Sequence, residues 1–127
     1  VIRGLHFQRP PFAQAKLVRV IKGKVLDVAV DIRKGSPTYG QHYSVLLTGD
    51  NHRQFFIPEG FAHGFVALED NSIFTYKCSQ FYHKEAEMSI RYNDPILNIA
   101  WGLDETPIMT EKDLCGVLFD QFNTPFE

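Results

Sequence analysis

Short β-rich segments, separated by turns rich in glycine, proline and asparagine, recur along the first 78 residues of the chain. Residues 17–32 contain two such segments, joined by the short turn Lys22-Gly23-Lys24. In the second segment, the even-numbered residues from 26 to 32 are aliphatic and share one face, whereas Asp27, Ala29 and Asp31 share the other. Strands of this kind at near-regular spacing predict an antiparallel sandwich or barrel, and therefore an all-β fold.

The same pattern predicts five further strands, at residues 1–8, 42–47, 53–57, 64–69 and 72–78. Helix signals are few. One helical turn is expected within residues 83–88, and another within 111–117 with Thr110 as its N-cap. Since there is no repeat or linker, residues 1–127 are expected to form one domain. The chain begins inside a predicted strand, so we expect that an upstream segment is missing.

Composition limits the classes of partner. The 13 Lys and Arg residues nearly balance the 15 Asp and Glu residues, which argues against non-specific binding of nucleic acid or of an anionic membrane. We expect no signal peptide, and no apolar run in the sequence could span a bilayer. The two cysteines, Cys78 and Cys115, do not form a disulfide framework, although a bond between them stays possible. A reducing, cytoplasmic location is the simpler interpretation.

The stretch RGLHFQRPPFAQAK, residues 3–16, raises the question of what His6 does. It could be a general base, a metal ligand or a histidine that only hydrogen-bonds a neighbour. The stretch is interpreted as a tight hairpin whose loop brings Lys16 beside His6, an arrangement that suits proton abstraction with charge developing on a nearby oxygen. Strict alternation places Arg3 and His6 on opposite faces, so a bulge near Gly4 is expected if both line one cavity.

In IPEGFAHGF, residues 57–65, Pro58 and Gly60 predict a tight turn, with the next strand starting at His63. The pattern PxGxxH resembles the second sequence motif of the cupins, which are small jelly-roll barrels. Metal-binding cupins add an upstream HxH motif, but here Gln8 takes the place of its second histidine. His6 and His63 alone are too few ligands, so a metal is not expected.

Residues 74–87 and 109–120 contain further candidates. Tyr76 could return a proton to a carbanion if it faces the cavity, and Tyr82 could stack on a flat ring at its rim. Phe74 and Phe81 are expected to fill the sheet. Lys112 and Asp113 are a solvated charge cluster by default. Alternatively, a carboxylate here could bond to a histidine and fix its tautomer.

Taken together, the chain resembles the dTDP-4-dehydrorhamnose 3,5-epimerases, which are cupin-like jelly rolls that work without a metal. The matching blocks are RGLHFQ, the run from QAK to PTYG, RQFFIPEGFAHGF, YNDPILNIAW and TEKD, and they occur in the family's order. RGLHFQ and IPEGFAHGF together are far more specific than either alone.

The resemblance implies roles for individual residues. It makes His6 the proton acceptor, Tyr76 the proton donor and Asp113 the carboxylate paired with His6, and it places Lys16 near the 4-keto oxygen of the sugar. It also implies substrate-binding positions at Arg3, His63, Glu87 and Lys112, with Tyr82 stacking on thymine. Asp27 and Asp31 lie in family blocks, but no catalytic role is assigned to either.

The implied reaction is epimerisation of dTDP-4-dehydro-6-deoxy-D-glucose at C3 and C5 to dTDP-4-dehydro-L-rhamnose, in dTDP-L-rhamnose biosynthesis and without a cofactor. The resemblance also implies a homodimer and an N-terminal substrate-binding segment that is not in this chain. Three alternatives stay open. They are an enzyme that inverts one carbon or isomerises the ketone, a non-catalytic sugar-binding cupin, and a metal-dependent cupin disfavoured by the missing HxH.

Overall fold

The fold is seen in a computed structural model that describes residues 2–99, 101, 113, 116–119, 122 and 124–126. The elements, in chain order, are β1 (Ile2–Gln8), β2 (Lys16–Lys22), β3 (Lys24–Asp31), β4 (His42–Thr48), β5 (Gln54–Ile57), β6 (Phe61–Ala67), β7 (Ile73–Cys78), the 3-10 turn η1 (Lys84–Ala86) and β8 (Glu87–Ser89). All the strands expected from the sequence form, within a few residues of their predicted bounds.

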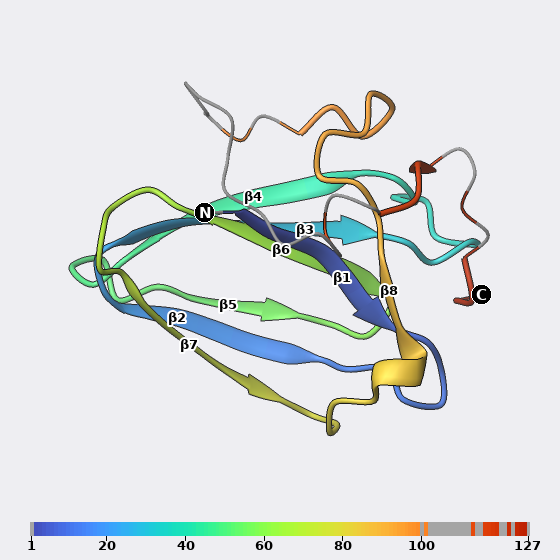
Figure 1. Cartoon of the computed structure of the whole chain (residues 1–127), viewed down its shortest axis with the longest axis horizontal. Coiled ribbons are helices and arrows are strands. Elements are labelled where there is room, and N and C mark those ends of the chain that lie inside the picture. Colours follow the sequence, from blue (N-terminus) through green and yellow to red (C-terminus); the bar gives the residue numbers. More distant parts are fainter. Residues whose placement is uncertain are drawn as a thin grey trace.

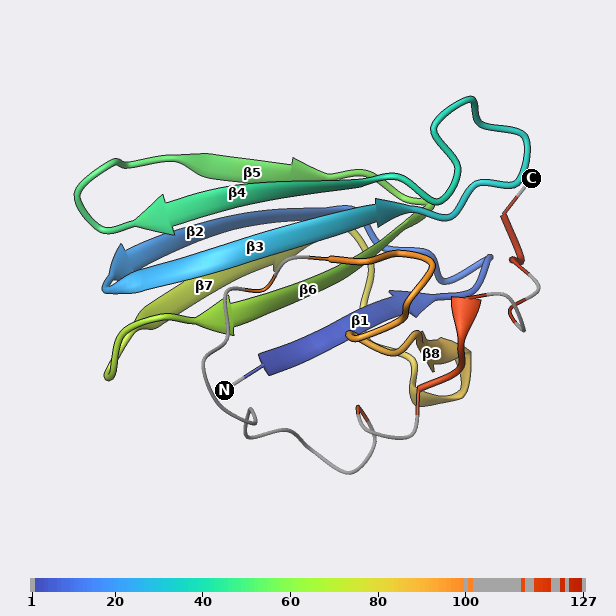
Figure 2. The same ribbon diagram turned by 90° about the horizontal axis from the view of Figure 1, so that it is seen from above.

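The strands make two antiparallel sheets that face each other (Figure 1). One has five strands in the order β4-β3-β6-β1-β8, and the other has three in the order β5-β2-β7. Figure 2 shows the two layers from above, where the strands of the three-stranded sheet are seen behind and between those of the five-stranded sheet. The fold is therefore an all-β sandwich, as the strand pattern predicts, and it is the cupin-like jelly roll that the family resemblance implies.

The connections between the first strands differ from the expected hairpin. β1 and β3 belong to the five-stranded sheet, but β2 lies between them in the chain and belongs to the three-stranded sheet. The hairpin over residues 3–16 is therefore wrong, and the Lys22-Gly23-Lys24 turn also carries the chain from one sheet to the other. Pro10 and Pro11 have no backbone N–H, so this loop has two fewer hydrogen-bond donors. Such a loop suits a connection between two sheets better than the tight turn of a hairpin.

β3 separates two hydrophobic clusters, because both of its faces are buried. Val28 and Val30 pack into a cluster outside the five-stranded sheet, as the predicted aliphatic face requires. Val25 and Ala29 point the other way, into a cluster between the sheets that includes Val18 and Ile57. The buried carboxylates of β3 therefore lie on the face that looks toward the opposite sheet.

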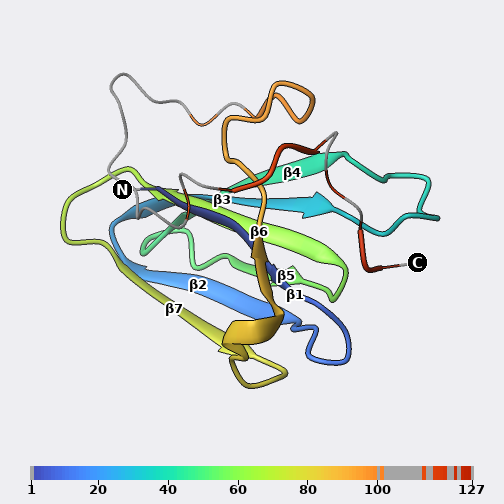
Figure 3. The same ribbon diagram turned by 45° about the vertical axis from the view of Figure 1, so that its right-hand side comes forward.

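The outer cluster is covered by the chain that follows β8, which crosses the five-stranded sheet (Figure 3). Ile90, Leu97, Trp101 and Phe122 supply buried side chains to it. The predicted helical turn within 83–88 is confirmed as η1, although its last residues form β8 instead. The second predicted turn falls mostly outside the described residues. Within the described part of the chain, no helix has the length and apolarity to cross a membrane.

Candidate functional site

A cavity of about 590 Å³ opens between the two sheets, at the end not filled by the inner cluster. This volume is within the range of small-ligand sites. Its walls combine polar and aromatic side chains, whereas the buried core beside it is aliphatic. The cavity is lined by Arg3, His6, Phe7, Gln8, Gln14, Lys16, His63, Phe65, Phe74, Tyr76, Cys78, Ser79, Gln80, Phe81, Tyr82 and Glu87.

An irregularity in β1 lets two charged positions face this cavity. The pairing between β1 and β6 shifts register between Arg3 and His6, which is the bulge expected near Gly4. Gly4 has a φ of +133°, and a Cβ there would lie 2.5 Å from the Cα of Gly64. Two glycines back to back therefore allow the strands to approach closely at the bulge. As a result, Arg3 and His6 both line the cavity.

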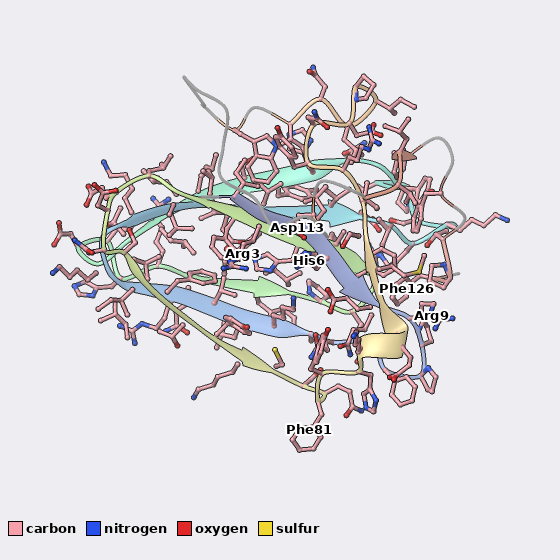
Figure 4. All side chains as sticks on the ribbon, viewed as in Figure 1. Arg3, His6, Arg9, Phe81, Asp113 and Phe126 are labelled. Atoms are coloured by element: carbon pink, nitrogen blue, oxygen red, sulfur yellow. The ribbon has the colours of Figure 1, made fainter. Side chains whose placement is uncertain are left out.

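His6 is paired with a carboxylate from the far end of the chain. Its Nε2 contacts Oδ1 of Asp113, and the two side chains lie together beside Arg3 in Figure 4. Asp113 is 1% exposed, whereas the His6 side chain is 25% exposed. A hydrogen bond donated by Nε2 to the carboxylate leaves Nδ1 as the basic nitrogen of the ring. The pair can therefore hold a histidine ready to accept a proton.

A second histidine-carboxylate pair lies deeper. Nε2 of His63 is 2.8 Å from Oδ1 of Asp27, and both residues are buried. Burial lowers the pKa of His63, and the hydrogen bond to Asp27 opposes this only in part, so His63 is neutral at pH 7. Burial raises the pKa of Asp27, against the effects of His63 and Lys16. The imidazole of His63 is therefore a neutral hydrogen-bonding group, and it is less suited than His6 to act as the base.

Lys16 and Tyr76 enter the cavity from the three-stranded sheet. Burial lowers the pKa of Lys16, while Cys78, Asp27 and Glu87 act in the opposite direction. Lys16 lies on β2 and Tyr76 on β7, whereas His6 lies on β1 of the facing sheet. The histidine and the tyrosine therefore approach the cavity from opposite walls.

The structure thus brings together most of the side chains singled out from the sequence. All of the candidate residues from Arg3 to Glu87 line the cavity, and Asp113 reaches it through His6. Lys112 lies outside the described residues. Among the described residues, no three His, Cys, Asp or Glu side chains converge as metal ligands.

Two expectations need correction, and one buried residue was missed. Phe81 does not fill the sheet, because it is 86% exposed and points away from the body of the molecule (Figure 4). Phe74 does pack in the inner cluster, as predicted. β6 begins at Phe61 rather than at His63. Asp27 was assigned no catalytic role, and its hydrogen bond to His63 was not identified from the sequence. Its place in a strand with both faces buried was the available signal.

Comparison with known proteins agrees with the family resemblance over most of the chain. Residues 1–121 match the family model described as dTDP-4-dehydrorhamnose 3,5-epimerase. The chain is 54% identical over 115 residues to the enzyme of that name from Methanothermobacter thermautotrophicus. The match covers 89% of this chain and 62% of the relative. It is 50% identical over 119 residues to the Shigella flexneri enzyme, covering 94% of this chain and 65% of the relative.

A solved structure agrees closely. The dTDP-6-deoxy-D-glucose-3,5-epimerase of Legionella pneumophila, in complex with dTDP-4-keto-L-rhamnose, superposes with a TM-score of 0.92 at 51% identity. The match covers 96% of this chain and 64% of that one. The chain thus spans a little less than two thirds of the length of these relatives.

Proposed function

Because the chain belongs to the dTDP-4-dehydrorhamnose 3,5-epimerase family, we propose that it is an isomerase that inverts C3 and C5 of dTDP-4-dehydro-6-deoxy-D-glucose to give dTDP-4-dehydro-L-rhamnose. One observation carries the proposal. A histidine bonded to a buried carboxylate and a tyrosine face the same cavity from opposite walls. Inversion of a carbon needs a proton to leave one face and another to arrive on the opposite face.

The proposed chemistry starts at the hydrogens next to the 4-keto group, which acidifies them. Nδ1 of His6, with Asp113 holding the ring, takes a proton from C3 or C5, and the electron pair of the C–H bond moves into an enolate. Tyr76 then gives its phenolic proton to the other face of that carbon. Exchange with water restores both groups, and the same steps follow at the second carbon.

Lys16 is the proposed partner of the enolate oxygen. Lys16 is partly buried in the cavity wall, so its ammonium attracts a developing negative charge more strongly than it would in water. Arg3 and Lys112 are proposed to hold the diphosphate, which suits the forked donors of arginine. His63 and Glu87 would contact the sugar part, and Tyr82, 62% exposed at the rim, would stack on the thymine ring.

The proposal includes the setting of the enzyme. No cofactor is required, because the ketone itself activates both C–H bonds. We propose a homodimer in the cytoplasm, in the route to dTDP-L-rhamnose for surface polysaccharides. The outer face of the three-stranded sheet supports the dimer, since Ile21, Phe56 and Ile73 are 49–58% exposed there.

To test this, the purified protein is incubated with dTDP-4-dehydro-6-deoxy-D-glucose, and the product sugar is identified by NMR. We expect dTDP-4-dehydro-L-rhamnose from the wild type, and a loss of roughly 10²–10⁴-fold in kcat for His6→Ala. A His6→Ala variant with wild-type kcat would contradict the assignment of the base. A product inverted at one carbon would favour the monoepimerase alternative, because the same groups could serve a single inversion.

A further inference from the structure

Gln8 is a buried side chain that the proposed chemistry does not use. It lies two residues beyond His6 at the end of β1, is 3% exposed and lines the cavity. Its Nε2 donates hydrogen bonds to the carbonyl oxygens of Phe12, at 2.7 Å, and Phe81, at 3.2 Å. Its Oε1 accepts one from the backbone N–H of His83, at 2.8 Å. Two carbonyl acceptors and one amide donor leave a single possible orientation for the side-chain amide.

These bonds join two loops at the mouth of the cavity, residues 9–15 and residues 79–86, which we call the rim loops. Other contacts tie the rim loops to each other. Gln14 donates to the carbonyl of Gln80 at 2.7 Å, and the rings of Phe12 and His83 stack with centroids 3.8 Å apart. The four residues in these contacts are partly buried, whereas Gln8, which bonds to both loops, is almost fully buried.

The second rim loop bears two exposed aromatic rings, Phe81 and Tyr82. Gln8 bonds the backbone of residues 81 and 83, so it holds the peptide on each side of Tyr82. Both N–H groups of its amide are already used within the protein, so they are not available to a molecule in the cavity. Gln8 can therefore act on a bound molecule through the rim loops.

We propose that Gln8 is a positioning residue for nucleotide recognition, which fixes the backbone around Tyr82 so that its ring stands ready to stack on the base of the substrate. The inference rests on the proposed function, because it takes a nucleoside diphosphate sugar as the molecule bound. Two residues of β1 would then have different tasks. His6 acts on the sugar, and Gln8 orders the surface that binds the nucleotide. A preordered aromatic ring binds better because less freedom is lost on binding.

The test compares Gln8→Met, which keeps the length of the side chain and removes its hydrogen bonds, with Gln8→Glu, which keeps the acceptor for His83 and loses both donors. For each variant we expect KM for the sugar nucleotide and Kd for dTDP to rise about tenfold, with kcat within about twofold, since loss of buried hydrogen bonds is worth about one factor of ten in an equilibrium constant. Gln41→Met, at an exposed glutamine, is the matched control.

A double mutant asks whether the effect passes through Tyr82. In a Tyr82→Ala background, Gln8→Met should raise Kd for dTDP by less than about twofold, because residues that act together are not additive. Hydrogen exchange of the free protein should be faster over residues 79–86 in Gln8→Met than in the wild type. Equal and additive effects in both backgrounds would overturn the proposal, as would unchanged exchange in these residues.

Failure of the inference can be told from failure of the proposed function. If the wild type converts the substrate but Gln8→Met keeps the wild-type KM and Kd, the function stands and the role of Gln8 is wrong. If the wild type neither binds dTDP nor converts the sugar nucleotide, both are wrong, even where hydrogen exchange shows that Gln8 orders the loop.

Discussion

His6 and His63 are direct partners on neighbouring strands, yet they have different environments. Each bonds to its own buried carboxylate, Asp113 and Asp27 respectively. The side chain of His63 is 7% exposed and that of His6 is 25% exposed. Depth thus distinguishes the two, because a neutral imidazole at the bottom of a cavity suits hydrogen bonding, whereas the more open ring can take up a proton and exchange it with water.

The partnership of Asp113 with His6 predicts a specific defect for Asp113→Asn. An amide can donate to Nε2, which would favour the tautomer with its proton on Nδ1 and block the basic nitrogen. We expect kcat to fall by about 10²–10⁴-fold with little change in Kd for dTDP. Steady-state kinetics and a binding titration measure the two quantities. Asp50→Asn, at an exposed turn, is the control. A wild-type kcat for Asp113→Asn would show that the carboxylate does not orient the base.

We expect Asp27 to affect the reaction through the pKa of Lys16. Its negative charge opposes the lowering of the Lys16 pKa by burial, so Asp27→Asn should lower that pKa further. If the ammonium stabilises the enolate, the alkaline limb of kcat/KM against pH should then move to lower pH. The profile is measured for the wild type, Asp27→Asn and the exposed control Glu69→Gln. An alkaline limb at the wild-type pH in Asp27→Asn would contradict this coupling.

Among the elements, the end of β3 is held to the following loop by Asp31. This buried carboxylate accepts hydrogen bonds from Arg33, Ser36 and Thr38. Burial raises the pKa of Asp31, but these bonds outweigh that effect and hold it well below its ordinary value. The side chain of Asp31 therefore fastens the loop of residues 33–41 to the sheet, together with backbone hydrogen bonds between residue 31 and residues 40 and 41.

The lowered pKa of Asp31 predicts how stability depends on pH. Since the carboxyl is more acidic folded than unfolded, its contribution is complete above about pH 4, the unfolded value, and is lost as the pH falls toward the folded pKa. Asp31→Asn should therefore cost about 1–3 kcal/mol in free energy of unfolding at pH 7, and less at pH 3. Urea unfolding at both values measures this. An equal loss at both would mean that ionisation of Asp31 contributes nothing.

The strands could be predicted from the sequence because alternation and turn residues act locally. The pairing of His6 with Asp113 was within reach through the family's motifs. The sheet to which β2 belongs was not, because alternation does not tell a strand which neighbours it will have. The same limit hid Asp27 and Gln8. Their partners lie 36 residues away for Asp27 and up to 75 for Gln8, so only the packed sheets bring them together.

At the scale of the whole molecule, we predict self-association through the outer face of the three-stranded sheet. Leu17 and Phe56 are direct partners there and both are exposed, whereas the C-terminal segment covers the other sheet. Phe56→Lys should convert a dimer into a monomer in sedimentation equilibrium, because a buried lysine without a partner is costly. Tyr43→Lys, on the five-stranded sheet, should leave the dimer intact. Equal dimerisation of the wild type and Phe56→Lys would place the interface elsewhere.

In the proposed reaction, protons leave and return at C3 and C5 through groups on opposite walls of one cavity. Conversion of dTDP-4-dehydro-6-deoxy-D-glucose in D₂O tests it most directly, with proton NMR reading each carbon of the product. We predict dTDP-4-dehydro-L-rhamnose with deuterium at both C3 and C5. Product that is inverted but keeps its original hydrogen at these carbons would contradict the account.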